Sequence, residues 1–116
     1  MLRLLTLVLA LTAGGGALAD TRLLMVEDQG CPFCRQFRAE ILPGYARHPQ
    51  GRAAPLTRVD IDGPWPNGLA LDRRPQVTPT FILLDDGREV ARIEGYPGRD
   101  GFWPMLGDML QQRGHR

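Results

Sequence analysis

The sequence predicts an α/β domain in which a central mixed β-sheet is flanked by helices. Short apolar runs typical of strands alternate with segments of helical periodicity, in the order β-α-β-α-β-β-α. An Asp-Gly pair between two neighbouring apolar runs indicates a tight antiparallel hairpin. This order fits a mixed sheet with helices on both of its faces.

Residues 1–19 have the profile of a cleavable signal peptide. Arg3 supplies a positive charge, residues 4–11 form an apolar run, and Ala17-Leu18-Ala19 fits the small-x-small rule for cleavage. The run is shorter than the about twenty apolar residues that cross a bilayer. We therefore expect one mature domain, residues 20–116, exported to the periplasm, with an uncleaved anchor as the alternative.

A change in the spacing of apolar residues predicts the first strand and the first helix. Residues 23–26 (LLMV) form a continuous apolar run, as expected for a strand covered on both faces. Beyond the first cysteine, Phe33, Phe37 and Ile41 recur at i, i+4 and i+8, which predicts an amphipathic helix with these side chains on its apolar face. Pro43-Gly44 stops or kinks that helix.

Alternation, turn residues and one helical stripe predict the remaining elements. The segment 85–87 (DDG) marks the hairpin between the last two strands. We expect a strand at 55–62, a loop at 63–68, a short helix at 69–73, strands at 80–84 and 88–93, and a closing helix over 102–110 that ends before Gly114.

The charge balance gives no indication of a nucleic-acid or acidic-membrane partner. The chain has 14 basic residues, all of them arginine, and 13 acidic ones, so its formal net charge is only +1. We expect a monomer with no nucleic-acid partner.

The only two cysteines, Cys31 and Cys34, stand in the motif GCPFC at the predicted start of the first helix. If Cys31 caps this helix, Pro32 occupies the first helical position, where its missing N–H costs nothing. The N–H groups of Phe33 and Cys34 then point at the sulfur of Cys31 and, together with the helix dipole, favour its thiolate. Cys31 is the expected nucleophile. Cys34, deeper on the same helix face, is the expected resolving thiol.

Three other uses of this pair are a disulfide staple, a zinc site and a copper carrier. A staple that closes so short a loop removes little entropy from the unfolded chain. Zinc needs about four ligands, and the two histidines, His48 and His115, lack zinc-finger spacing. Two soft thiolates do suit Cu(I), so a copper carrier remains open as a different class of function. We expect no resident metal or cofactor.

A second motif, residues 77–81 (VTPTF), favours disulfide exchange over copper transfer. A proline just before an apolar strand can adopt the cis form, and the backbone of Thr78 is then free to pair with a visiting strand. We therefore expect Thr78 and Pro79 to orient a protein partner. The alternative is an ordinary trans proline at the start of a strand.

A strand, a C-x-x-C motif that opens a helix, TPTF before a hairpin and a final helix together resemble the thioredoxin-like fold across residues 20–116. The segments GCPFC, EILPGY, APLTRVDI, TPTFILLDDGREVARIEGYPG and FWPML are similar to the exported SoxS-type thioredoxins of the bacterial sulfur-oxidation (Sox) system. This resemblance implies a thiol-disulfide oxidoreductase that keeps the exported sulfur-carrier protein of that system reduced. A membrane-embedded thiol-electron carrier would reduce it again. A disulfide donor would have the same residues, so the direction of electron flow stays open.

Several residues depart from ordinary thioredoxins. Pro32-Phe33 stands where Gly-Pro is usual and resembles the Pro-aromatic pair of glutaredoxins, which favours a potential less reducing than about −270 mV. Gly30 replaces the usual tryptophan and opens space beside Cys31.

Two charged residues are candidates to support the cysteines. Met25 holds the position of the buried acid that commonly assists the second cysteine, and Glu27 lies on the same strand face about 7 Å nearer the motif. Glu27 is either a replacement proton acceptor or a solvated carboxylate at a strand end. Arg35, one turn beyond Cys31, either favours its thiolate or is simply solvated.

Overall fold

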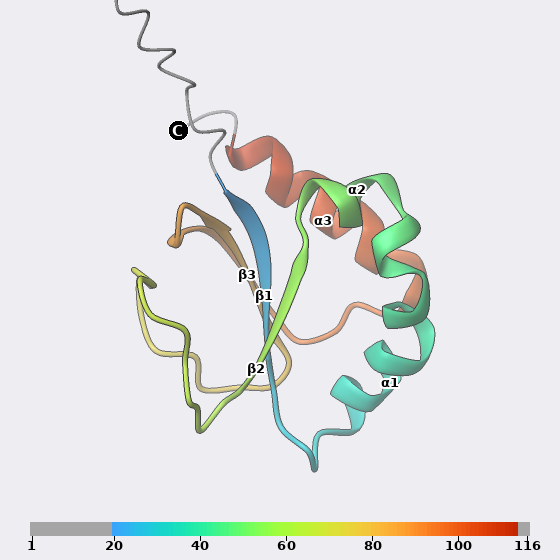
Figure 1. Ribbon diagram of the computed structural model, residues 1–116. Helices are drawn as coiled ribbons and strands as arrows, with labels where there is room; N and C mark the ends of the chain where they lie inside the picture. Colours follow the sequence, from blue (N-terminus) through green and yellow to red (C-terminus); the bar gives the residue numbers. More distant parts are fainter. Residues whose placement is uncertain (1–19, 114–116) are drawn as a thin grey trace, which may run out of the picture.

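The computed structural model describes residues 20–113, so the expected signal peptide at 1–19 lies outside the described residues. Within this range no helix is long and apolar enough to span a bilayer. The elements, drawn in Figure 1, are β1 (Thr21–Glu27), α1 (Pro32–Glu40), the 3-10 helix η1 (Leu42–Arg47), α2 (Pro49–Ala53), β2 (Leu56–Asp60), β3 (Thr80–Asp85), β4 (Arg88–Glu94) and α3 (Arg99–Arg113).

Strand β1 lies in the interior of a mixed sheet with the order β2-β1-β3-β4. It pairs in parallel with β2 and antiparallel with β3, which pairs antiparallel with β4. Burial on two faces explains the apolar run at 23–26, because all four of these side chains are fully buried. The register sets Val26 opposite Thr80, so β1 ends and β3 begins at the same end of the sheet.

One face of the sheet carries the larger core and the helices (Figure 1). Met25 of β1 points to this side, where Phe37 of α1 is fully buried. The Phe37 ring lies 5.1 Å from the ring of Phe81 and 5.2 Å from that of Phe102, between centroids, in tilted or edge-on contacts. Phe37 thereby ties α1, which carries both cysteines, to β3 and α3.

The opposite face is covered by an irregular segment, residues 61–79, instead of a helix (Figure 1). The expected helix at 69–73 does not form, so the expectation of helices on both faces is wrong. Four side chains of the segment, Ile61, Trp65, Leu69 and Leu71, pack against a smaller core cluster made of Leu24, Val26, Val59, Ile82 and Leu84.

Backbone pairing with β4 explains why residues 69–73 are not helical. The N–H of Ala70 donates to the carbonyl of Gly87 at 2.8 Å, and its carbonyl accepts from the N–H of Glu89 at 3.0 Å. These bonds form an isolated parallel bridge between Ala70 and Arg88. A five-residue helix has a costly nucleus and few bonds to offset it, and two prolines, Pro66 and Pro75, stand close to either end of it.

Two short helices in residues 42–53, η1 and α2, were not expected from the sequence. Each begins with a proline in its first turn, which is pre-organised for helical φ. The cap of α2 is His48, whose Nδ1 accepts from the N–H of Gln50 at 3.1 Å and whose ring stacks on Trp103 at 3.6 Å. Histidine is a rare cap, so the usual Ser, Thr, Asp or Asn signal was missing.

The hairpin and the closing helix follow the sequence prediction. Asp86 and Gly87 have φ of 50° and 80°, the left-handed pair that a two-residue turn between β3 and β4 requires. In α3 the buried residues are Phe102, Leu106 and Met109, which follow the spacing of one helix face. This face of α3 completes the larger core.

Candidate active site

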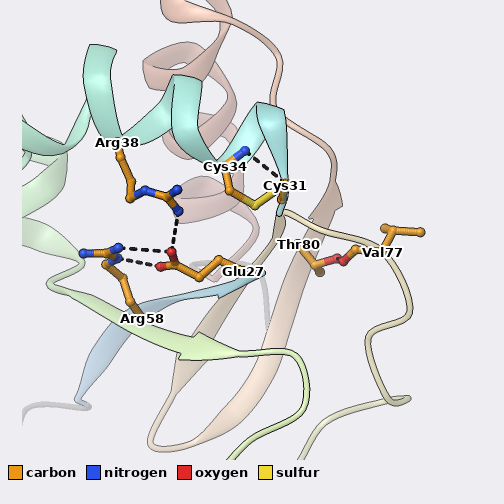
Figure 2. The surroundings of a disulfide bond; sticks show 7 residues. All are labelled: Glu27, Cys31, Cys34, Arg38, Arg58, Val77 and Thr80. Atoms are coloured by element: carbon orange, nitrogen blue, oxygen red, sulfur yellow. Dashed lines mark hydrogen bonds and ion pairs between the residues drawn. A yellow bond between two sulfur atoms is a disulfide. The ribbon is translucent and has the colours of Figure 1, made fainter. Parts of the chain in front are cut away.

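Cys31 and Cys34 form a disulfide at the N-terminus of α1, with 5.2 Å between their Cα atoms (Figure 2). Cys31 is the N-cap, with φ −85° and ψ 111°, and its sulfur accepts from the N–H of Cys34 at 3.1 Å. Pro32 begins the helix, as the GCPFC motif predicts. Cys34 is fully buried and Cys31 is 6% exposed, so of the two residues only Cys31 reaches the protein surface.

Cys31 lies at the positive end of the α1 helix dipole. The first turn of α1 contains no acidic residue, so no carboxylate there offsets the positive end of the helix dipole. Arg35 is in the second turn and exposed. The site therefore favours a negative charge on the outer sulfur.

Residues 77–79, which include the docking residues expected from the sequence, lead into β3 at the end of the sheet where β1 ends. The Thr78–Pro79 peptide bond is cis. Two hydrogen bonds fix this segment: Thr80 Oγ1 donates to the carbonyl of Val77 at 2.7 Å, and the N–H of Gly95 donates to the carbonyl of Pro79 at 2.7 Å. Thr78 is partly exposed between these two anchored positions. Figure 2 draws Val77 and Thr80, joined by their hydrogen bond, among the surroundings of the disulfide.

Phe33 and Val77 are the exposed large hydrophobic side chains of the described residues, at 58% and 44%. Phe33 was expected on the buried face of the first helix, and this expectation is wrong. Since Cys34 itself occupies that face, the buried stripe is Cys34, Phe37 and Ile41, and Phe33 is rotated away from it. We call Phe33 and Val77 the apolar pair. Val77 was not singled out from the sequence, although it opens the VTPTF motif.

Glu27, at the end of β1, lies between two arginines (Figure 2). Its carboxylate accepts from Arg38 of α1 at 2.6 Å and from Arg58 of β2 at 2.5 and 3.0 Å, and its side chain is only 14% exposed. Partial burial acts to raise the pKa of Glu27, but the hydrogen bonds and charges of Arg58 and Arg38 outweigh it and lower the pKa. Glu27 is thus an ion-paired carboxylate rather than a freely solvated one.

This ion pairing predicts a pH-dependent contribution to stability. A lowered pKa stabilises the folded state above the unfolded value of about 4.3, and the contribution is lost as pH falls through the folded pKa. We expect Glu27→Gln to lower the free energy of unfolding by about 1 kcal/mol at pH 7 and the difference to shrink below about pH 4. Urea unfolding at a series of pH values measures it.

The matched control is Glu94→Gln. It removes a carboxylate that forms a 3.1 Å ion pair with Arg73, in which both side chains are exposed. Exposed pairs contribute little, so its effect should stay within about 0.5 kcal/mol at every pH. A Glu27→Gln difference that is constant from neutral to acid pH would contradict the assignment.

Similarity to known proteins identifies the family of this chain. A family model described as a thioredoxin-like domain matches residues 17–110. The chain belongs to the thioredoxin-like family. The crystal structure of the reduced periplasmic thioredoxin SoxS from Paracoccus pantotrophus is 47% identical, superimposes with a TM-score of 0.78, and covers 81% of this chain and 99% of that one.

Two further proteins that the chain resembles are more distant. A protein from Brevibacillus choshinensis named disulfide bond formation protein is 29% identical over 92 residues, covering 77% of this chain and 75% of its own. Fasciola hepatica thioredoxin is 17% identical with a TM-score of 0.55, over 78% of this chain and 82% of that one, a likeness of fold alone. With its cysteine pair, this thioredoxin-like chain is a thiol-disulfide oxidoreductase.

The site residues expected from the sequence come from three parts of the chain. The cysteines are at the start of α1, Thr78 and Pro79 are in the segment before β3, and Glu27 is at the end of β1. Met25, at the usual position of the buried acid, is fully buried in the larger core. Among residues 20–113, no group of three or more His, Cys, Asp or Glu side chains has the arrangement of metal ligands.

Proposed function

We propose that this protein reduces disulfides of exported proteins in the periplasm, with Cys31 as the nucleophile and Cys34 as the resolving thiol. The observation that carries the proposal is the difference between the two sulfurs. Cys31 caps α1 through its sulfur and is 6% exposed as a residue, whereas Cys34 is fully buried. This is the arrangement needed for one sulfur to meet a partner and the other to meet only its neighbour.

The reaction proceeds by two thiol-disulfide exchanges. In the dithiol form, the Cys31 thiolate attacks one sulfur of the partner disulfide, which breaks that bond, forms a mixed disulfide and releases a partner thiolate. The Cys34 thiol then gives up its proton and attacks the Cys31 sulfur, which forms the Cys31–Cys34 disulfide and releases the second partner thiolate. Two electrons pass from the cysteine pair to the partner, and the two partner thiolates take up one proton from Cys34 and one from solvent.

Thr78 and the apolar pair orient the partner in this proposal. The backbone of Thr78, held beside buried Pro79, pairs with the extended backbone of the partner, and the apolar pair contacts side chains that flank its disulfide. Because Arg38 and Arg58 bind both carboxylate oxygens of Glu27 and lower its pKa, Glu27 is a weak base that braces α1 against β2 instead of accepting the Cys34 proton. Arg35 adds positive charge one turn from Cys31.

The 47% identity to a periplasmic thioredoxin SoxS supports the compartment and suggests the partner. We place the protein in the periplasm and assign it the exported sulfur-carrier protein of the Sox system as its substrate, in the reducing direction. The oxidised cysteine pair then needs two electrons from a membrane-embedded thiol-electron carrier. The name of the Brevibacillus choshinensis relative favours a second candidate function, a disulfide donor that runs in the opposite direction.

The midpoint potential of the Cys31/Cys34 couple distinguishes the two directions. Because Pro32-Phe33 resembles the glutaredoxin pair, we expect a value of about −200 to −230 mV, less reducing than the about −270 mV of thioredoxin. Equilibration with glutathione buffers of known ratio, followed by thiol alkylation and mass spectrometry, gives the potential. A value near −120 mV would reject the reductase and support the disulfide donor.

A further inference from the structure

An ion pair on β4, between Glu89 and Arg92, is almost completely buried. The two side chains are 3% and 4% exposed, and the Arg92 Nη2 and Nε atoms donate to the Glu89 carboxylate at 2.7 and 3.1 Å. Arg92 stands opposite Ile82 in the β3–β4 register, which places it on the sheet face that the irregular segment covers. Neither residue takes part in the proposed exchange reaction.

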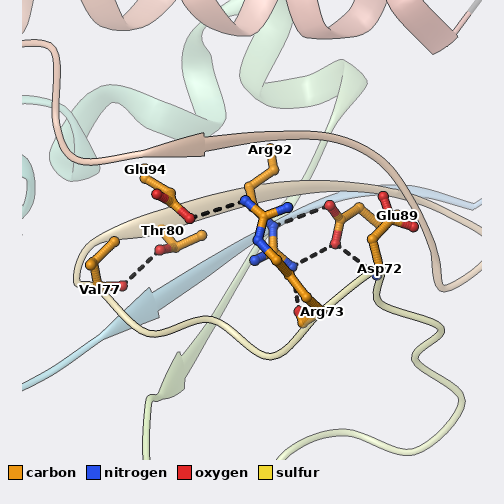
Figure 3. A network of polar contacts seen from close by, with 7 residues as sticks. All are labelled: Asp72, Arg73, Val77, Thr80, Glu89, Arg92 and Glu94. Carbon is orange, nitrogen blue, oxygen red and sulfur yellow. Dashed lines mark hydrogen bonds and ion pairs between the residues drawn. The ribbon is translucent and has the colours of Figure 1, made fainter.

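Both members of the pair bind the backbone of the irregular segment (Figure 3). Glu89 Oε1 accepts from the N–H of Asp72 at 3.2 Å, and Arg92 Nη2 donates to the carbonyl of Arg73 at 2.6 Å. With the backbone bridge at Ala70, these contacts attach residues 70–73 to β4. Only three residues, 74–76, separate this attachment from Val77, whose carbonyl is bound by Thr80.

A buried ion pair is an inefficient way to stabilise a fold, because an apolar pair of similar volume often does as well or better. The cost is visible here, since Nη1 of Arg92 is buried without a hydrogen-bond partner among the described residues. An apolar pair, however, could not bind both an N–H and a carbonyl of a segment that lacks its own regular hydrogen bonds. Positioning of that segment is therefore the function that the geometry favours.

We infer that the Glu89–Arg92 pair positions the docking segment, residues 73–79, against the cysteines. The two residues are positioning residues: they act through the backbone of Asp72 and Arg73 and do not touch the reacting sulfurs. This inference rests on the proposed function, in which residues 77–79 receive the partner. It predicts that the Glu89–Arg92 pair affects how well the protein binds its protein substrates. The reactivity of the Cys31–Cys34 disulfide itself should not depend on the pair.

The test replaces both charges together, as Glu89→Leu/Arg92→Met, so that no single buried charge is left unpaired. We expect KM for insulin, used as the protein disulfide, to rise about tenfold while kcat changes less than about threefold. Reduction of the Cys31–Cys34 disulfide by dithiothreitol, which needs no docking segment, should keep its rate, and the midpoint potential should not move. Hydrogen exchange should accelerate at residues 72–79 and not in α1.

Two control variants separate positioning from loss of stability. Val77→Ser, a change within the docking segment, should raise KM in the same way. Met109→Ala opens a cavity in the larger core on the other face and should lower stability without raising KM. If the double variant does not fold, Arg92→Lys replaces it, because one ammonium group cannot reach both Glu89 and the Arg73 carbonyl as the guanidinium does.

An unchanged KM in the folded double variant, or in Arg92→Lys, overturns the inference. A shifted potential also overturns it, because the pair would then act on the cysteines. If the wild-type protein itself fails to reduce insulin, it is the proposed function that is rejected. In that case hydrogen exchange alone tests whether the pair positions residues 72–79. Unchanged exchange protection of these residues in the double variant would reject the inference.

Discussion

Replacing Cys31 with serine is expected to abolish the reduction of protein disulfides. Cys31 caps α1 through its sulfur and, unlike fully buried Cys34, keeps 6% of its surface exposed, and a serine hydroxyl at this position is not a nucleophile at neutral pH. We expect the dithiothreitol-dependent rate of insulin reduction to fall at least about 1,000-fold. Turbidity of the precipitating insulin chains measures the rate.

The loss must be separated from unfolding. Cys31→Ser removes the disulfide but keeps an N-cap side chain, because serine is itself a preferred cap, so the thermal midpoint should be compared with that of the reduced wild-type protein. A Cys31→Ser protein that keeps the wild-type rate would show that Cys31 is not the nucleophile. The fold would be unaffected by that result.

Replacing Cys34 with serine is expected to trap the partner. Cys34 is fully buried and reaches only the Cys31 sulfur, so without it a mixed disulfide between Cys31 and the partner has no internal thiol to resolve it. We expect covalent complexes to accumulate in the periplasm of sulfur-oxidising cells. Non-reducing gels and mass spectrometry should identify the sulfur-carrier protein among them.

Cys31→Ser/Cys34→Ser is the matched control, because it presents the same surface without a reactive sulfur and should capture nothing. A lone reactive cysteine also reacts with abundant bystanders, so enrichment of the carrier over other exported cysteine proteins is the informative quantity. Recovery of other exported proteins without the carrier would exclude the Sox substrate and leave the thiol-disulfide chemistry in place.

The parts of the fold that the sequence predicted are those set by neighbouring residues. The apolar run at 23–26 requires burial on two faces, the Asp86-Gly87 pair requires a tight turn, and Cys31 followed by Pro32 requires a helix start. Each of these elements formed where it was expected. The turn and the helix start are determined by a few adjacent residues, and the apolar composition of residues 23–26 indicates a buried strand without identifying its partners.

The missed features depend on distant residues. Residues 69–73 (LALDR) are mostly good helix formers, but the backbone of Ala70 pairs with β4 and that pairing outweighs a weak local preference. Phe33 has the i, i+4 spacing of a core residue, but it is exposed because Cys34 occupies the buried face of α1. The partners of Glu27 could not be chosen from the arginines of the sequence, because Arg58 reaches it only through the parallel register of β1 and β2.

The interior place of β1 in the sheet has a consequence for how the chain folds. Its two neighbours begin at residues 56 and 80, so a chain that emerges from its N-terminus cannot cover residues 23–26 until most of the molecule has followed. Non-local strand pairing of this kind raises contact order and delays collapse. During that delay the apolar stretch beside the reactive cysteines is exposed, and we expect holdase chaperones that bind unfolded chains to recognise residues 21–27 first.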